Sequence, residues 1–420
     1  MILKNCRFIL TQNSSRDILE GADIKIEENK IVKIGKNLRA ERGEEKLDCS
    51  RVLVMPGLIN CHCHVAMTQM RGVADDVNLQ EFLNKTFELD AKMKREHVHA
   101  GAIIGIIEMI KSGTTAFQDL YYFEDAVAEA ARKIGMRGVL AWAVLDKEFT
   151  TQQGVPLENA KKFAESIKND PLLRPALGLQ GVYVCSERTY MDSKEFCEHE
   201  GLTMHTHLSE NSVEVSEHVK KTGMRPAEWL EKIGFLSWRL SAAHCVHLAD
   251  DEISMLARRG VSVVHCPSSN LKLSSGIMNW GGLKAAGVNI SLGTDGCASN
   301  NNLDMFEEMH IAALLHKLQG PSVARAQEVL DAATINGARA IGINAGSIEV
   351  GKLADLITID LNDTRWTPLI KSMLISHIVY SISSSSVRDS IINGKLVMQN
   401  RKIDDEEKML RAAEQLMLRR

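Results

Sequence analysis

Two histidines, His62 and His64, stand two positions apart at the end of an apolar run. Alternate side chains of a strand point to the same face, so both imidazoles share one face while Cys61 and Cys63 point to the other. Two imidazoles at a strand end form half of a metal site, although an ordinary pair of polar strand residues explains this motif equally well. We expect the cysteines to be small packing residues.

Other polar residues close later apolar runs. His207 and Glu210 end one run, His244 ends the next, and Asp295 ends the last one. His205 shares the inward face with His207 by alternation, and we expect it to line the pocket or to lie behind the ligands. Each residue alone has an ordinary explanation, but their joint position at run ends indicates a single site.

Three imidazoles and one carboxylate would form an N3O ligand set, which suits Zn²⁺ or Fe²⁺ and also accepts Mn²⁺. A second metal ion would need a bridging ligand such as a lysine, and the run 174–184 contains none. Lys147 is the nearest candidate and is expected to be solvated. The sequence therefore favours one divalent metal ion per chain, with zinc first. The predicted ligands are His62, His64, His207 and Asp295.

Such a centre lowers the pKa of water toward neutrality and permits hydrolytic attack on a trigonal carbon. Asp295 could act as the general base, and His244 could stabilise the developing charge. Glu210 could pass a proton to a ring nitrogen of the substrate. These groups suit hydrolytic removal of ammonia from an aromatic amidine, and they suit amide or ester hydrolysis almost as well.

The segments that position these residues alternate between apolar runs and helical-period stretches that end in glycine, such as 124–135 and 250–260. Eight such units predict an α/β fold with a (β/α)8 TIM-type barrel, whose active site lies at the carboxyl ends of the strands. The eight runs cover residues 54–64, 114–121, 137–146, 174–184, 202–210, 240–248, 261–270 and 288–296.

Both ends of the chain differ from the middle. Residues 1–55 show period-two patterning, which returns at 351–360 and 386–403 and predicts antiparallel β structure. The stretch 404–420 begins with acidic and ends with basic residues, which favours a closing helix. We predict a small β-sandwich domain from both termini, with this helix, over residues 1–55 and 346–420, and a catalytic barrel over 56–345.

Composition narrows the class of protein. The 420 residues carry a net charge of −4, with 45% hydrophobic and 25% charged residues, which is typical of an enzyme and favours neither nucleic acid nor membranes as partners. No run approaches the ~20 apolar residues of a spanning helix, and the N-terminus lacks a signal-peptide pattern. The nine scattered cysteines indicate reduced thiols and a cytoplasmic location.

Several of these motifs resemble the amidohydrolase superfamily, and they are similar to its branch of 5′-methylthioadenosine, S-adenosylhomocysteine and 5′-deoxyadenosine deaminases. The resemblance covers nearly the whole chain and rests on PGLINCHCH, HLSE, AAHCVHL, HCPSSNLKLSSGI and GTDGCASNNNLDMFEEM. It implies deamination of the adenine ring of a 5′-modified nucleoside, and a homo-oligomer. The implied metal ligands are His62, His64, His207 and Asp295, with Glu210 as proton shuttle and His244 as catalytic histidine.

The chain departs from this family pattern at the substrate end. Where the family places a glutamate on the ribose hydroxyls, the closest counterpart is Asp90, with Glu88 second. Gln180 replaces a substrate-contacting histidine and can form hydrogen bonds without charge. No arginine lies between Arg137 and Arg174, where relatives acting on S-adenosylhomocysteine carry one. The resemblance therefore favours 5′-deoxyadenosine or 5′-methylthioadenosine over S-adenosylhomocysteine.

Three alternatives remain from the sequence. A guanine or triazine aminohydrolase or chlorohydrolase of the same superfamily would have no ribose for Asp90 to bind. A ring-amide hydrolase of the dihydroorotase type would need the absent bridging lysine. An assembly protein that has lost catalysis should also have lost ligands, which this chain retains.

Overall fold

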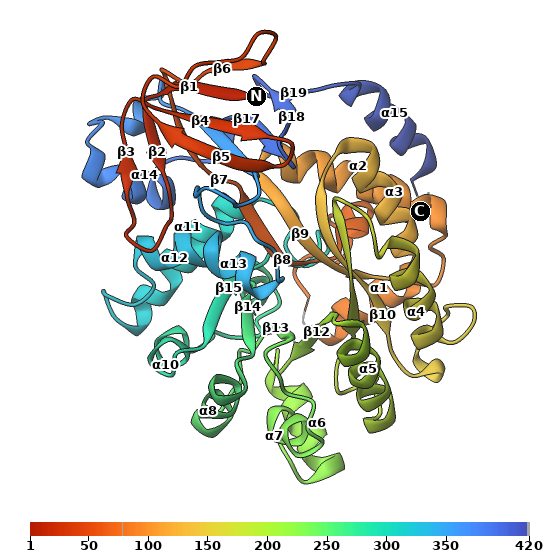
Figure 1. The fold of residues 1–420 in the computed structure, drawn as a ribbon. Coiled ribbons are helices and arrows are strands. Elements are labelled where there is room, and N and C mark those ends of the chain that lie inside the picture. The colour runs from red at the N-terminus through yellow and green to blue at the C-terminus, as the bar shows by residue number, and fades with distance from the viewer. Residues whose placement is uncertain (78, 418–420) are drawn as a thin grey trace.

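The computed structural model describes residues 1–77 and 79–417, and its centre is an eight-stranded parallel sheet in the order β15-β14-β13-β12-β11-β10-β9-β8 (Figure 1). Each strand pairs with the next one in the chain, as a β/α barrel requires. The strands are β8 Leu58–Cys63, β9 Thr114–Tyr121, β10 Arg137–Val144, β11 Leu173–Leu179, β12 Thr203–Leu208, β13 Leu240–His244, β14 Ser262–His265 and β15 Asn289–Leu292.

The sheet closes where the segment after β15 meets β8. The backbone N–H of Asp295 donates to the carbonyl of His62 at 2.9 Å, and the N–H of Thr294 donates to Asn60 Oδ1 at 3.0 Å. A Cβ atom on Gly293 would lie 2.8 Å from the Cβ atom of His62, so glycine permits this approach. The predicted TIM-type barrel is confirmed, and its closure brings the first and last strands together.

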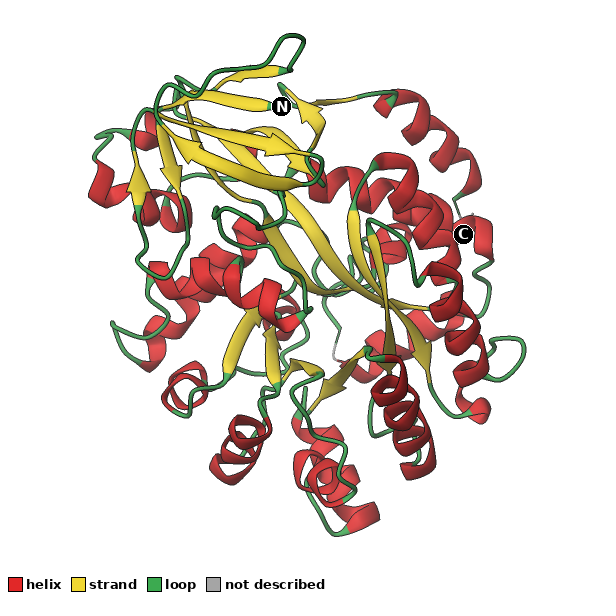
Figure 2. Ribbon diagram, viewed as in Figure 1, coloured by secondary structure: helices red, strands yellow, loops and turns green. Residues whose placement is uncertain are grey.

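Helices surround the strands (Figure 2), and two of them have the bounds that the glycine pattern predicts. The helix α3 Glu124–Ile134 ends at Gly135, with φ +92°, and α8 Asp250–Arg259 ends at Gly260, with φ +69°. The other helices of this layer are α1 Leu79–Asp90, α2 Arg95–Lys111, α4 Pro156–Ile167, α5 Glu187–Glu200, α6 Ser212–Thr222, α7 Pro226–Lys232, α9 Pro267–Lys272, α10 Trp280–Ala285, α11 Met305–Leu315, α12 Ala326–Ala332 and α13 Ile335–Ala340.

The two ends of the chain form additional sheets, and the red and blue strands lie together in Figure 1. One has the order β19-β18-β17-β16-β7-β2-β3 and the other β5-β4-β1-β6. The strands are β1 Ile2–Cys6, β2 Phe8–Leu10, β3 Ile18–Leu19, β4 Ala22–Glu27, β5 Lys30–Gly35, β6 Lys46–Asp48, β7 Val52–Pro56, β16 Leu356–Asp360, β17 Val387–Ile392, β18 Lys395–Gln399 and β19 Lys402–Ile403.

The first predicted run, 54–64, was wrong as a single strand. Its start belongs to β7, which pairs antiparallel with β16, and only its later part forms β8 of the barrel. Gly57 separates them, and a Cβ atom there would lie 2.0 Å from Thr115 Oγ1. An uninterrupted apolar run conceals this change of sheet, because both strands are buried along their whole length.

Two further helices are α14 Leu374–Tyr380, between β16 and β17, and α15 Glu406–Leu416, which follows β19. The predicted closing helix is therefore present, while residues 418–420 of its predicted span lie outside the described residues. The division into domains at residues 55 and 345 stays a prediction. Within residues 1–77 and 79–417, no helix combines the length and apolar character needed to cross a membrane.

Candidate metal centre and active site

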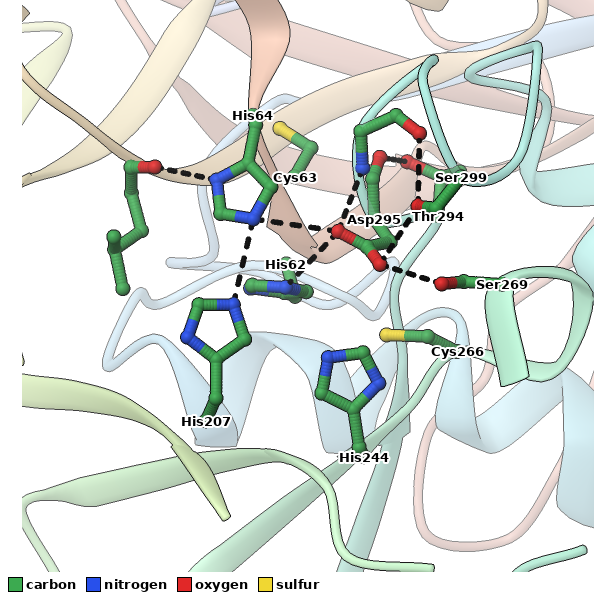
Figure 3. Close-up of polar contacts among 12 residues, drawn as sticks. His62, Cys63, His64, His207, His244, Cys266, Ser269, Thr294, Asp295 and Ser299 are labelled. Atoms are coloured by element: carbon green, nitrogen blue, oxygen red, sulfur yellow. Dashed lines mark hydrogen bonds and ion pairs between the residues drawn. The ribbon is translucent and has the colours of Figure 1, made fainter. Parts of the chain in front are cut away.

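The four predicted ligands lie together at the carboxyl rim of the barrel (Figure 3). Asp295 Oδ1 is 3.5 Å from His62 Nε2 and 3.3 Å from His64 Nε2, and the Nε2 atoms of His64 and His207 are 3.4 Å apart. Two ligands of one tetrahedral zinc ion are separated by about 3.3 Å. The spacing of these atoms therefore fits a single divalent ion.

Backbone carbonyls fix which nitrogen each outer histidine presents to the cluster. His64 Nδ1 contacts the carbonyl oxygen of Leu120 at 2.5 Å, and His207 Nδ1 contacts that of Gln180 at 2.7 Å. A carbonyl oxygen only accepts hydrogen bonds, so both Nδ1 atoms carry the hydrogen. In the neutral rings, the Nε2 lone pairs then face the cluster, as metal binding requires.

His62 is held through another histidine. His62 Nδ1 lies 2.7 Å from His205 Nε2, and His205 Nδ1 lies 3.0 Å from the carbonyl oxygen of Ser241. The carbonyl obliges His205 to donate from Nδ1, so His205 Nε2 accepts and His62 Nε2 keeps its lone pair. Burial lowers the pKa of His62 to about 4, which favours the neutral ring. His205 thus lies behind the ligands.

Asp295 is fixed by three hydrogen bonds. Its Oδ2 atom accepts from the hydroxyls of Ser269 at 2.6 Å and Ser299 at 2.9 Å, and its Oδ1 atom accepts from the N–H of Gly296 at 2.7 Å. The backbone of Asp295 has φ +61°, a left-handed conformation that costs a non-glycine residue about 1–3 kcal/mol. The barrel closure and these bonds hold Oδ1 toward the histidines.

His244 and Glu210 lie beside this cluster. His244 is buried, has φ +70°, and contacts Asn270 Oδ1 through Nδ1 at 2.9 Å. Its Nε2 atom is 3.8 Å from Glu210 Oε2, and burial raises the pKa of the Glu210 carboxyl. Ligand atoms of His62, His244 and Asp295 also lie within 4.8 Å of one another, so His244 could contact the same ion or its water.

The comparison with protein families shows which family the chain belongs to. A model of the amidohydrolase family matches residues 53–397. The chain belongs to the amidohydrolase family. This amidohydrolase is 43% identical over 383 residues to a 5-methylthioadenosine/S-adenosylhomocysteine deaminase from Thermococcus sibiricus, covering 90% of the chain and 89% of the relative. It is 42% identical over 403 residues to a 5′-deoxyadenosine deaminase from Methanocaldococcus jannaschii, covering 94% and 95%.

The fold of the chain is also similar to that of a solved structure. The amidohydrolase superposes on an adenosine deaminase from Xanthomonas campestris, solved with bound zinc, with a TM-score of 0.93 and 32% sequence identity. The match covers 99% of this chain and 97% of that chain. Both the barrel and the sheets built from the termini therefore have a counterpart in a known protein.

A cavity of about 380 Å³ opens over the cluster of this amidohydrolase and is lined by all four residues predicted to bind substrate, Asp90, Gln180, Glu210 and Asp295. The hydroxyl of Tyr121 donates to Asp90 Oδ1, and burial raises the pKa of Asp90 to about 6. Asp90 is therefore a cavity residue, whereas Glu88 is absent from the wall. The remaining wall includes Phe82, Leu83, Phe87, Leu145, Phe149, Tyr183 and Leu273.

Sequence reasoning missed the side chains that hold the reactive groups. Ser269 and Asn270 lie just beyond β14, so the strand-end rule that found the other site residues would also have indicated them. Ser299 lies in a turn four residues beyond Asp295, and nothing in the alternation of strands points to it.

Cys61 and Cys63 are both buried packing residues, as predicted. Cys61 is buried beside Ile59 inside the barrel, and Cys63 Sγ lies 3.3 Å from Asp119 Oδ1. The same Asp119 oxygen accepts from the backbone N–H of Val65 at 2.6 Å. Neither thiol faces the histidine cluster, and the nine cysteines of the described chain are all free and buried.

Proposed function

We propose that this amidohydrolase removes ammonia from the adenine ring of a 5′-modified nucleoside by metal-dependent hydrolysis, leaving the inosine analogue. The observation that carries the proposal is one cavity lined by both the histidine–aspartate cluster and Asp90, with Glu210 and His244 beside the cluster. The names of relatives more than 40% identical over most of the chain support the same chemistry.

His62, His64, His207 and Asp295 would hold one divalent ion, with zinc proposed because neutral imidazoles and one carboxylate suit it. When bound, such an ion lowers the pKa of water and so supplies a nucleophile at neutral pH. The zinc-bound deaminase of the same fold supports this choice. One ion per chain is proposed, since β11 contains no lysine to bridge a second.

The chain's own groups would handle the protons. Asp295 accepts a proton from the attacking water, and His244, fixed by Asn270, stabilises the charge that develops during attack. Glu210 delivers a proton to the ring nitrogen, since its pKa is raised by burial and its carboxylate lines the cavity. Water adds to the carbon that carries the amino group, and ammonia leaves as the C–N bond breaks.

Asp90 and Gln180 would bind the ribose. A carboxylate accepts hydrogen bonds from the two ribose hydroxyls, and Gln180 can donate or accept beside it. The described residues that line the cavity include no arginine or lysine. An uncharged 5′ group is therefore proposed, with 5′-deoxyadenosine or 5′-methylthioadenosine ahead of S-adenosylhomocysteine or adenosine.

The test is turnover of these four nucleosides by the purified protein, followed through loss of adenine absorbance. Glu210→Gln should lose at least about 100-fold in kcat, because an amide cannot transfer the proton. Turnover of guanine or a triazine, with no adenine nucleoside consumed, would overturn the proposal in favour of that rival. The cytoplasmic location and the homo-oligomer stay predictions.

A further inference from the structure

The loop that carries Glu210 has no regular secondary structure of its own. It joins β12 to α6, and its first residue, Ser209, adopts a left-handed φ of +48°. The carbonyl of Ser209 accepts from the N–H of His247 at 2.9 Å, which ties the loop to the segment after His244. The position of the Glu210 carboxylate therefore depends on whatever fixes this short backbone.

Glu214, in the first turn of α6, contacts that backbone directly. Its Oε1 atom accepts from the N–H of Ser209 at 3.1 Å, and its Oε2 atom accepts from the N–H of Glu210 at 2.8 Å. Two consecutive N–H groups thus point at the two oxygens of one carboxylate. Burial raises the pKa of the Glu214 carboxyl to about 7, while these two N–H groups favour its ionised form.

These bonds are not ordinary helix capping. In a capping box, the third residue of the helix accepts from the N–H of the N-cap residue. The N-cap of α6 is Asn211, whose Oδ1 atom itself accepts from the N–H groups of Val213 and Glu214. Glu214 reaches past Asn211 to the two residues before it, so its carboxylate serves the loop.

We propose that Glu214 is a positioning residue that sets the orientation of Glu210 toward the substrate ring. The inference rests on the proposed role of Glu210 as proton carrier. Glu214 holds the N–H of Glu210 from one side, while Ser275 Oγ at 3.4 Å and His244 Nε2 at 3.8 Å face its carboxylate from the other. Losing the backbone bonds would let the loop shift, and misplacement by about 1 Å can cost about 100-fold in rate.

The experiment compares three variants of the metal-loaded enzyme. Glu214→Ala removes both acceptors and should lower kcat by about 10- to 100-fold with KM changed less than about threefold, because proton delivery matters in the transition state. Glu214→Gln keeps one accepting oxygen, so its kcat should lie between the kcat of Glu214→Ala and that of the wild type. Glu217→Ala is the matched control, since Glu217 lies on the same helix and makes no hydrogen bond to residues 209 or 210.

A double-mutant cycle with Glu210→Gln separates positioning from general stability. If Glu214 acts through Glu210, adding Glu214→Ala to Glu210→Gln should lower kcat less than about twofold further. Additive losses, or a Glu214→Ala variant as active as Glu217→Ala, would overturn the inference. The cycle uses whichever substrate the wild type turns over best among adenine nucleosides, guanine and triazines, so a wrong substrate assignment is seen separately in the wild type.

Discussion

His62 Nδ1 and His205 Nε2 lie 2.7 Å apart in the barrel interior, and both side chains are completely buried. The contact makes His205, the first histidine of the HTH sequence on β12, part of the support for His62, the first histidine of the HCH motif on β8. Because His205 is fixed in turn by Ser241, the ring of His62 has one orientation and one tautomer. A ligand of the proposed ion is thus set by a residue that does not face the cavity.

Replacing His205 should therefore weaken metal binding without removing a ligand. His205→Leu deletes the acceptor for His62 Nδ1–H and should lower the metal affinity about 10- to 100-fold. Chelator competition measures this change. His205→Gln keeps an acceptor and should lose less, and His199→Ala, at an exposed histidine, should lose nothing. Wild-type affinity in His205→Leu would show that the contact has no part in metal binding.

Metal content should be about one ion per chain, because the three imidazoles and one carboxylate converge as the ligands of a single ion. Elemental analysis of the purified protein measures the ratio. Stripping with a chelator should abolish turnover, and zinc should restore it. A ratio near two would contradict the single centre and revive a two-metal hydrolase.

Asp90 should discriminate substrates by the presence of a ribose. Asp90→Ala should lower kcat/KM for the nucleoside about 10- to 100-fold, corresponding to about 1–3 kcal/mol for hydrogen bonds to a charged group. Steady-state kinetics with the nucleoside and with free adenine measure the effect. The kcat/KM for free adenine should change little. An equal loss of kcat/KM for the nucleoside and for free adenine would show that Asp90 maintains the shape of the cavity and does not bind the ribose.

Glu308 should make the stability of the fold depend on pH. Burial raises the pKa of this carboxyl from its ordinary 4.5 to about 8. Hydrogen bonds from the N–H of Ser268 and the amide of Asn300 lower the pKa, but burial has the larger effect. The stabilisation that comes from binding a proton at Glu308 in the folded state is therefore fully present below about pH 4.5 and is lost as pH rises through 8. The free energy of unfolding should fall by up to about 1 kcal/mol per pH unit over this window from this group.

Glu308→Gln removes the titrating group, so its stability relative to wild type should rise between pH 5 and pH 9. Urea denaturation at the two pH values measures the difference. Glu307→Gln is the matched control, because the neighbouring Glu307 is exposed. The same stability difference at both pH values would contradict a protonated Glu308 in the folded protein.

Much of the candidate site was predictable because active-site residues of a β/α barrel lie at the carboxyl ends of its strands. His207 and His244 lie in the last two positions of β12 and β13, and Asp295 and Glu210 follow their strands by two or three residues. Parallel strands of a barrel bring such residues to one rim whatever their separation in the chain. Alternation on β8 was a weaker guide, because the register of β8 against β9 shifts between Asn60 and Cys63.

The remainder depends on contacts that no local pattern encodes. The backbone carbonyls of Leu120 and Gln180, which fix two histidine tautomers, have no sequence signal. The change of sheet at Gly57 lies within an unbroken apolar run, because both flanking strands are buried. The bonds from Glu214 to the loop of Glu210 require the left-handed turn at Ser209, which a serine seldom adopts and its type does not reveal.

The most direct measurement is product analysis after incubating the zinc-loaded protein with 5′-deoxyadenosine and 5′-methylthioadenosine. The account predicts the corresponding inosine analogue and one equivalent of ammonia for each nucleoside consumed, with both products formed at least about 100-fold more slowly by Glu210→Gln. Intact nucleosides after incubation with a fully metal-loaded, folded protein, or cleavage of the glycosidic bond to free adenine, would contradict it.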